Sequence, residues 1–491
     1  MPASNLTGSN NSKWYWRPWF LLVIGIILMA VSDMRGGAAA LAWFSPIPFM
    51  LYAHIYLGRK RLWWLFVALQ LGSLITISKI ITPPMSYALT LIFSIPTGIA
   101  MFLVFSFWGY IRRKLGAIIG IYSFISLIVV LEWAQYYTSD MGAWGALSHS
   151  QIYNLPLLQS SALFGSLGIS ALMTFGASIL TEWIVYKDTK KLSLHIILFV
   201  TIFSLFHIYG SIRLLSVQKG EHVKVAGVNS DLILTGKLPK ANEPIIKKTT
   251  KEMLVRSLKA ANLGAKIIIW NEGSTIIDKE KESKFLKTIS KMAQKKLVHI
   301  VAAYIVPTKN EGKFENKYTW VKPNGVIAQQ YFKHHPVPGE GSIKGTKPLR
   351  VIKTKYGNLA GAICYDYDFP KMALQHSRLG ADIVFVPSSD WRGIDPQHTL
   401  MTRIRAIEGG FSLLRSVRSA TSMAFDAYGR VRASLSYFER NEKIIFASLP
   451  TKKVATLFSL TGDWLHLPAI IYLLYITFLI LKLRKNKKLD F

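Results

Sequence analysis

Long apolar segments constrain this chain more than any other feature of its sequence. Seven of them precede a polar region and an eighth follows it, at about 19–33, 37–57, 62–82, 87–109, 115–132, 160–186, 192–209 and 463–482. Each is close to the roughly 20 residues that an α-helix needs to cross a bilayer. Helices are expected because the backbone polar groups of a segment in lipid must be paired within that segment. The sequence therefore predicts a polytopic α-helical membrane bundle.

The distribution of lysine and arginine predicts how the chain is oriented. Basic clusters occur in alternate loops and in the tail, at 59–61, 112–114, 187–191 and 482–488. The loops between them, such as 82–87 and 133–159, contain no lysine or arginine. Because basic loops stay in the cytoplasm, both termini are expected there and the polar region is expected outside. This pattern gives an N-terminal bundle of about seven spans, an external domain, and a C-terminal span with a basic tail, at 1–210, 211–460 and 461–491.

The net charge of +32 does not indicate a nucleic-acid partner. Much of the excess lies in the basic loops. The lysine-rich stretches 247–259 and 279–296 of the external domain alternate with apolar residues at helical spacing, which is typical of the solvated faces of amphipathic helices. The bilayer is the expected partner of the chain, which we expect to be a monomer. The single cysteine, Cys364, excludes an internal disulfide.

Short apolar runs separated by polar helical stretches characterise the external domain. Five runs have the length and composition of buried strands, at 223–228, 265–270, 299–304, 359–364 and 381–386. Helical patterns fall between several of them, which predicts an α/β layer fold. In such folds, catalytic side chains are expected at the carboxyl ends of the strands.

Glu272 follows the expected strand at 265–270, Cys364 closes the one at 359–364, and Lys333 closes a further expected strand at 329–333. A reactive thiol needs a base that removes its proton and a cation that stabilises the thiolate. A carboxylate can serve as that base, and an ammonium group can stabilise both a thiolate and an oxyanion. Taken singly, a charged residue after a strand is usually solvated, and a lone cysteine is often structural. Together the three residues predict a nucleophilic thiol site.

The sequence around these residues resembles the nitrilase, or carbon–nitrogen hydrolase, superfamily. The resemblance is carried by Trp270-Asn-Glu272, by Tyr331-Phe-Lys333 with Pro338-Gly-Glu340, and by Cys364-Tyr-Asp366 with Phe369-Pro370. It implies a four-layer αββα sandwich with Glu272 as general base, Lys333 as the cation that stabilises an oxyanion, and Cys364 as nucleophile. It also implies that Glu340 orients Lys333 or Glu272. It implies neither a cofactor nor a metal.

Seven spans before such a domain and one after it resemble the apolipoprotein N-acyltransferase family. The stretches 41–48, 157–170, 397–408 and 413–416 add smaller similarities. This resemblance implies an acyltransferase of the bacterial inner membrane, with its catalytic domain on the periplasmic side. Cys364 would take a fatty acyl chain from a phospholipid as a thioester. The acyl chain would then pass to the α-amine of the N-terminal diacylglyceryl-cysteine of a lipoprotein, so donor phospholipid and diacylated lipoprotein would be the partners.

Three positions depart from the pattern of that family. Asn271 replaces the usual proline before the base, Pro338-Gly-Glu340 lacks the bulky residue usual before its glycine, and Asp366 stands where glutamate is usual. The alternative function is therefore a membrane-anchored amidase or nitrilase-type hydrolase that uses the same triad with water as acceptor. The intact triad argues against a third interpretation, a non-catalytic membrane scaffold.

Further residues near the predicted thiol are candidates for supporting roles. Tyr365 and Trp391 are candidates for the wall of a thioester pocket, and plain core packing is an equally good interpretation. Asp366 is the third supporting candidate. His334 and His335 follow the lysine directly, but no carboxylate or cysteine is spaced to complete a metal site. We expect these histidines to position the loop.

Overall fold

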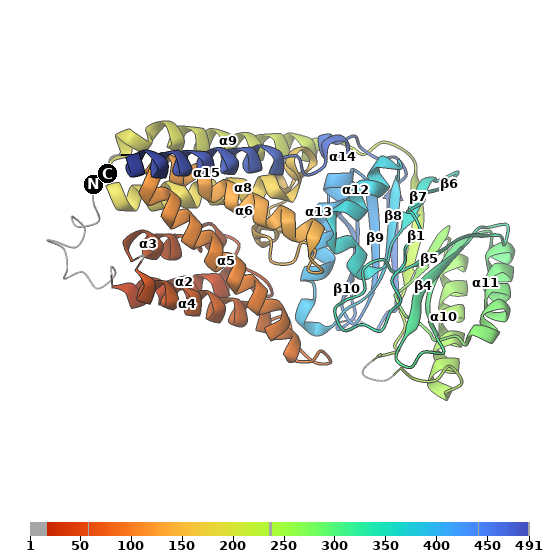
Figure 1. Ribbon diagram of the computed structural model, residues 1–491. Helices are drawn as coiled ribbons and strands as arrows, with labels where there is room; N and C mark the ends of the chain where they lie inside the picture. The colour runs from red at the N-terminus through yellow and green to blue at the C-terminus, as the bar shows by residue number, and fades with distance from the viewer. Residues whose placement is uncertain (1–16, 57, 235–237, 440, 490–491) are drawn as a thin grey trace. The chain divides into compact units, whose positions relative to one another are not determined.

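The computed structural model describes residues 17–56, 58–234, 238–439 and 441–489 of the chain (Figure 1). These residues divide into two compact units. The first unit runs up to Gln135, over Trp144–Ser211 and from Asp463 onward, and the second comprises Tyr136–Ala143 and Ile212–Gly462. The short stretch Tyr136–Ala143 lies within the range expected for the bundle, yet it packs with the second unit.

Apolar helices make up the first unit. Their bounds are α2 (Pro18–Ser32), α3 (Ile47–Ile55), α4 (Arg59–Ser78), α5 (Ala88–Leu115), α6 (Ala117–Thr138), α8 (Ser161–Tyr186), α9 (Thr189–Leu215) and α15 (His466–Leu489). Shorter pieces lie between them: η2 (Leu41–Trp43), η3 (Leu147–Gln151) and α7 (Leu155–Leu158). Within the described residues, six helices are long and apolar enough to cross a membrane: α4, α5, α6, α8, α9 and α15. The predicted helical membrane bundle is confirmed.

Two of the eight expected spans are short helices in the structure. Helix α2 has 15 residues, as many as the predicted span, whereas the second expected span is the turn η2 followed by α3, which has only nine residues. A helix of that length rises only ~14 Å, about half of the ~30 Å hydrocarbon core. Pro46 and Pro48 stand at the start of α3. Proline has no N–H and is favoured in the first turn of a helix, which suits the start of α3 at this point.

The second unit contains two six-stranded sheets, ordered β12-β1-β2-β3-β4-β5 and β11-β10-β9-β8-β7-β6. The strands are β1 (His222–Val228), β2 (Ile267–Trp270), β3 (His299–Pro307), β4 (Phe314–Val321), β5 (Ile327–Phe332), β6 (Ile352–Thr354), β7 (Gly357–Gly361), β8 (Ile383–Ser389), β9 (Ser412–Arg418), β10 (Thr421–Phe425), β11 (Val431–Ser436) and β12 (Ile444–Pro450). The two sheets pack against each other through β1 with β9 and β2 with β8.

Helices cover the outer face of each sheet. On the first sheet lie α10 (Pro244–Asn262) and α11 (Glu282–Lys296), whereas α13 (Gln397–Gly409) packs on β9 and β10 with α12 (Pro370–Arg378) beside it (Figure 1). Two short pieces, η4 (Lys279–Lys281) and α14 (Leu457–Thr461), complete the helical layers. The order helix, sheet, sheet, helix is the predicted αββα sandwich, which is confirmed.

Both faces of the central strands are covered, which explains their continuous apolar sequences. Every residue of β2 is buried. Strands β1, β2 and β3 run parallel, as do β7, β8 and β9. Four predicted strands correspond to β1, β2, β3 and β8. The predicted strand at 359–364 ends earlier, at Gly361, because Cys364 has a φ of +47°, which a β-strand excludes.

Candidate active site

The three residues predicted to form the triad follow strands that end at one edge of the sandwich. Glu272 comes after β2, Lys333 directly follows β5, and Cys364 begins the turn η5 (Cys364–Asp368) after β7. The Glu272 N–H donates to the carbonyl oxygen of Ser388 on β8 at 3.3 Å. This bond joins the ends of the two sheets, so residues from both sheets meet here.

Lys333 is the centre of a buried cluster of charged side chains. Its Nζ donates to Glu272 Oε1 at 2.9 Å and to Glu340 Oε2 at 2.7 Å. Asn316 Nδ2 donates to the same two carboxylates, at 2.7 Å and 3.0 Å. Burial lowers the pKa of Lys333, but Glu272 and Glu340 outweigh it and raise that pKa well above its ordinary value. Lys333 is therefore an ammonium held between two carboxylates, and Asn316 is a partner that the sequence did not reveal.

Cys364 lies at a backbone position that few side chains adopt. Its φ of +47° carries a strain of about 1–3 kcal/mol that the surrounding structure must hold. The side chain is buried. Burial and the carboxylates of Glu272 and Asp390 raise the pKa of the thiol well above its ordinary value, against the lowering effect of Arg415 and Lys333. Cys364 therefore rests as a neutral thiol and needs a base before it can attack.

Asp366 holds the cysteine turn against the end of the lysine strand. Its Oδ2 accepts from the Ile363 N–H at 2.9 Å and from the Tyr331 hydroxyl at 2.7 Å. Its Oδ1 accepts from the backbone N–H groups of His334 and His335 at 3.0 Å and 2.7 Å. Burial raises the pKa of Asp366, but the hydrogen bond and charge of His335 outweigh it, so the pKa lies below its ordinary value. Asp366 thus joins η5 to the loop after β5.

Replacing Asp366 with asparagine should destabilise the catalytic unit by on the order of 2–3 kcal/mol, because an amide group then faces N–H donors. A carboxylate with a depressed pKa stabilises the folded state at neutral pH, and this contribution is lost as the pH falls through the folded-state pKa. The stability gap between wild type and Asp366→Asn should therefore be full above about pH 5 and shrink below about pH 4. Unfolding of both purified proteins across this range measures the gap. If the difference in stability between the two proteins were as large at pH 3 as at neutral pH, the Asp366 carboxylate would not hold the two segments together as described.

The two predicted aromatic residues have different surroundings. Tyr365 is buried in η5, and its hydroxyl donates to the carbonyl oxygen of Asp140 at 2.8 Å. Trp391 is half-buried and directly precedes the turn η6 (Arg392–Ile394). Tyr365 therefore anchors the cysteine turn itself, which neither interpretation from the sequence included.

The stretch Tyr136–Ala143 braces the cysteine turn at a second point. The Ala143 N–H donates to the carbonyl oxygen of Asp368 at 2.9 Å. Gly142 has a φ of +54°, and a Cβ at this position would lie 2.8 Å from the same carbonyl oxygen. Only glycine combines that conformation with so close an approach. The sequence did not predict this brace, because it comes from the loop after α6.

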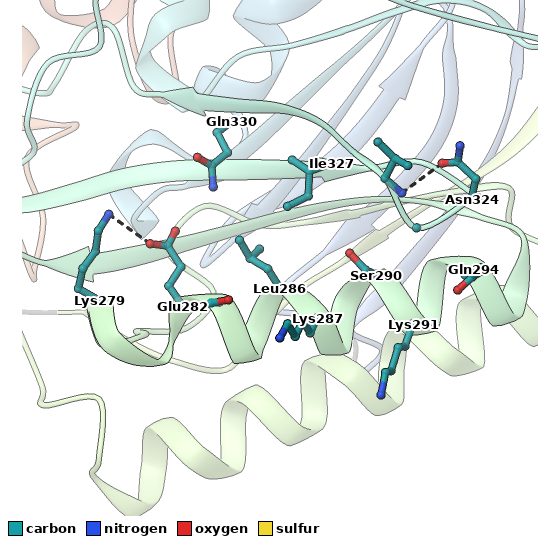
Figure 2. A pocket seen from close by; sticks show the side chains of 13 residues that line it. Lys279, Glu282, Leu286, Lys287, Ser290, Lys291, Gln294, Asn324, Ile327 and Gln330 are labelled. Carbon is teal, nitrogen blue, oxygen red and sulfur yellow. Dashed lines mark hydrogen bonds and ion pairs between the residues drawn. The ribbon is translucent and has the colours of Figure 1, made fainter.

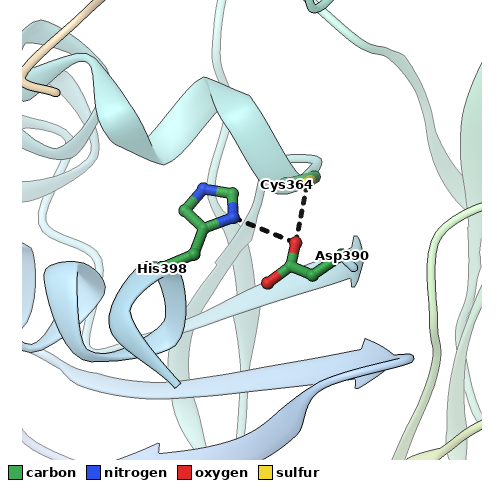
Figure 3. A group of neighbouring side chains, drawn as sticks. All are labelled: Cys364, Asp390 and His398. Atoms are coloured by element: carbon green, nitrogen blue, oxygen red, sulfur yellow. Dashed lines mark hydrogen bonds and ion pairs between the residues drawn. The ribbon is translucent and has the colours of Figure 1, made fainter. Parts of the chain in front are cut away.

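A second group of charged side chains lies beside the thiol (Figure 3). Asp390 Oδ1 is 3.7 Å from Cys364 Sγ and 2.9 Å from His398 Nδ1. Nη2 of Arg415 lies 3.2 Å from Asp390 Oδ1, 2.8 Å from His398 Nδ1 and 3.8 Å from Cys364 Sγ. These residues were not predicted from the sequence as members of the site. A signal was present, since an arginine inside an apolar strand is almost never buried unless it is paired.

The group also has the ligand types of a metal site. Ligand atoms of Cys364, Asp390 and His398 lie within 4.8 Å of one another. The Arg415 guanidinium already contacts all three of these ligands and would repel a second cation among them. The residues therefore fit arginine as their cation better than a metal ion.

A groove of about 590 Å³ lies elsewhere on the second unit, between α11 and the hairpin of β4 and β5 (Figure 2). Lys287 and Lys291 of α11 stand along it, and Ile327 and Gln330 of β5 lie opposite. Among the described residues, its lining has no member in common with the clusters around Lys333 and Cys364. Lysines on the solvated face of an amphipathic helix need no ligand, so the groove is not a candidate active site.

Comparison with known proteins gives two matching family models. Residues 15–179 match the apolipoprotein N-acyltransferase N-terminal domain, and residues 240–457 match the carbon-nitrogen hydrolase model. The apolipoprotein N-acyltransferase of Geobacter metallireducens is 23% identical over 86% of this chain and 88% of its own length. That of Haemophilus ducreyi is 28% identical over 73% and 75%. Among solved structures, an amidase from Nesterenkonia sp. is 16% identical, with a TM-score of 0.39, over 48% of this chain and 93% of that one.

Proposed function

The chain belongs to the apolipoprotein N-acyltransferase family, and on this premise we propose that it transfers a fatty acyl chain from a phospholipid to the α-amine of diacylglyceryl-cysteine on lipoproteins. One observation carries the proposal. The only cysteine of the chain is buried, and Asp366 joins its turn to the loop that directly follows Lys333, which holds Glu272. The apolar helices of the first unit suit two substrates that both reside in lipid.

The first half of the proposed reaction loads the thiol. Glu272 accepts the proton of Cys364, and the thiolate attacks the ester carbonyl carbon of the phospholipid. Both hydrogen bonds from Lys333 and Asn316 go to Glu272 Oε1, so we assign the proton to Oε2. Lys333 stabilises the oxyanion that forms on the carbonyl oxygen. The ester C–O bond then breaks, the leaving alkoxide takes the proton from Glu272, and a thioester and a lysophospholipid result.

The second half of the proposed reaction transfers the acyl group. The neutral α-amine of diacylglyceryl-cysteine attacks the thioester carbonyl, and Glu272 accepts the proton that the amine loses. Lys333 stabilises the second oxyanion. The C–S bond breaks, an amide forms, and the thiolate regains its proton from Glu272. Water must be kept from the thioester until the amine arrives.

The identity of the acceptor is tested with purified full-length protein in phospholipid vesicles and a synthetic diacylglyceryl-cysteine peptide. If the proposal is correct, mass spectrometry will show the peptide heavier by one acyl chain and an equal amount of lysophospholipid. Omitting the peptide should leave acylated enzyme with little free fatty acid. Rapid release of free fatty acid with no acylated peptide would instead identify a hydrolase.

We propose that the protein resides in the bacterial inner membrane with its second unit on the periplasmic side. The alternation of basic loops with loops that lack lysine and arginine, such as 82–87 and 133–159, supports this orientation. A reporter active only in the cytoplasm should work when fused near Arg113 or Lys187 and should fail within 212–462. A reporter active only in the periplasm should show the opposite pattern. Cytoplasmic activity of a fusion within 212–462 would overturn the orientation.

A further inference from the structure

Arg415 is a buried cation beside the nucleophile, and the reaction steps above give it no role. It lies in β9, a strand whose residues are all buried, and its own side chain is fully buried. Its Nη2 is 3.8 Å from Cys364 Sγ. Arg415 and Lys333 are the cations whose charges oppose the raised pKa of this thiol. The sulfur is therefore under the influence of Arg415 as well as Lys333.

A chain of charged side chains holds Arg415 in place. A buried guanidinium is costly unless carboxylates pair with it, and Asp390 supplies this pairing at 3.2 Å and 3.4 Å. His398 Nδ1 contacts both Arg415 and Asp390. The Nε2 of the same ring lies 2.9 Å from both oxygens of Asp368. Because Nε2–H must donate to that carboxylate, the orientation of the ring is fixed.

Part of the hydrogen-bonding capacity of Arg415 is unused. Its Nε and Nη1 atoms are buried and have no hydrogen-bond partner within the described part of the chain. Leaving charged donors without partners is unfavourable. Sites that stabilise developing negative charge nevertheless keep such donors and dipoles in place beforehand. The resting thiol of Cys364 carries no charge, whereas the thiolate formed during the reaction does.

We propose that Arg415 is a fourth catalytic residue, which stabilises the Cys364 thiolate before it attacks and again when the thioester breaks down. Asp390, His398 and Asp368 are positioning residues that act through Arg415. Lys333 is then available for the oxyanion. The inference rests on the proposed acyl transfer, because only a thiol that serves as nucleophile needs a stabilised thiolate.

Asp390 is not an alternative base, although it accepts the hydrogen bond of the thiol at 3.7 Å. Burial raises its pKa, but the charges of His398 and Arg415 outweigh this effect and lower it to about 2. A carboxylate with that pKa holds a proton poorly. Its contacts with Arg415 and His398 fit a positioning role, and Glu272 keeps the role of the base.

The test measures the pH dependence of Cys364 alkylation by iodoacetamide, which reacts with thiolates, in the full-length protein. Cys364 is the only cysteine, so the label reports a single site. Arg415→Gln is made in the Asp390→Asn background, because removing both partners of a buried pair is better tolerated than leaving one charge alone. We expect the alkylation midpoint to rise by at least about one pH unit on addition of Arg415→Gln, a tenfold lower thiolate fraction at neutral pH.

Arg415→Lys in the same background should recover part of the shift, since it restores the charge without the planar group. The matched control is Arg430→Gln, which removes an arginine paired with Asp426 in the same unit, and it should leave the midpoint unchanged. Equal midpoints for Asp390→Asn with and without Arg415→Gln, in proteins that unfold at similar temperatures, would overturn the role of Arg415.

Alkylation needs neither phospholipid nor acceptor peptide. A failed acyl-transfer assay with an intact shift would therefore count against the proposed function alone.

Discussion

Replacing Cys364 with alanine or serine should reduce acyl transfer by on the order of 10⁴-fold or more, because a nucleophile and its base act as one unit. In the wild type, labelled phospholipid should leave one acyl group on the protein, and hydroxylamine should release it from the thioester. Neither variant should form this adduct in a hydroxylamine-sensitive form. The rate of peptide acylation and the mass of the intact protein measure the two effects.

Loss of fold would not explain this result. Both substitutions are small and retain the buried position of the side chain, so the unfolding temperature should stay near that of the wild type. Because Cys364 is the only cysteine of the chain, the alanine variant has no thiol that could form a thioester. Acyl transfer at the wild-type rate by Cys364→Ala would rule out Cys364 as nucleophile.

Replacing Lys333 with methionine should impair both the chemistry and the stability of the catalytic unit. Loss of the group that stabilises the oxyanion should lower the rate by about 10²–10³-fold. The buried carboxylate of Glu272 and the half-buried carboxylate of Glu340 would lose their shared cation, which should cost about 3–5 kcal/mol of unfolding free energy. Denaturant unfolding and single-turnover acylation of Cys364 measure the two losses separately.

Lys317 offers a matched control for this variant. It is also a buried lysine between two carboxylates, with its Nζ 2.5 Å from both Glu282 of α11 and Glu315 of β4. Lys317→Met should cost comparable stability, but the fraction that remains folded should acylate Cys364 at nearly the wild-type rate. If both methionine variants lost acylation to the same degree, the effect of Lys333 would be structural and its role at the oxyanion would be refuted.

The sequence predicted those parts of the fold that depend on local pattern. Buried strands such as β2 and β8 were recognisable because both faces are covered, so their residues are uniformly apolar. The expected second span was the main exception. Its composition is apolar, yet a new helix starts inside it at Pro46 and Pro48. The average hydrophobicity of a segment does not show where a backbone N–H is missing, so it could not predict this break.

The candidate site shows a similar division. Glu272, Lys333 and Cys364 each lie at or just beyond the end of an expected strand, so their positions could be predicted one strand at a time. The group formed by Asp390, His398 and Arg415 could not, because it combines a strand end, the helix α13 and the middle of β9. Such a contact depends on how three layers pack, and a single sequence contains that information only as an unexplained arginine in an apolar strand.

The brace formed by Tyr136–Ala143 ties the catalytic turn to a loop that lies far away in the sequence. Tyr365 and the Asp140 carbonyl oxygen that it contacts are 225 residues apart. A gene fragment encoding only 212–462 would retain the three predicted triad residues and every strand of both sheets, but the Tyr365 hydroxyl and the Asp368 carbonyl would lose these partners. The enzyme is thus poorly suited to dissection into modules. In a random-mutagenesis screen for lost activity, substitutions at Gly142 should be recovered together with those around Cys364. The Gly142 substitutions would affect the same catalytic turn, although from the sequence they lie in a loop between membrane helices.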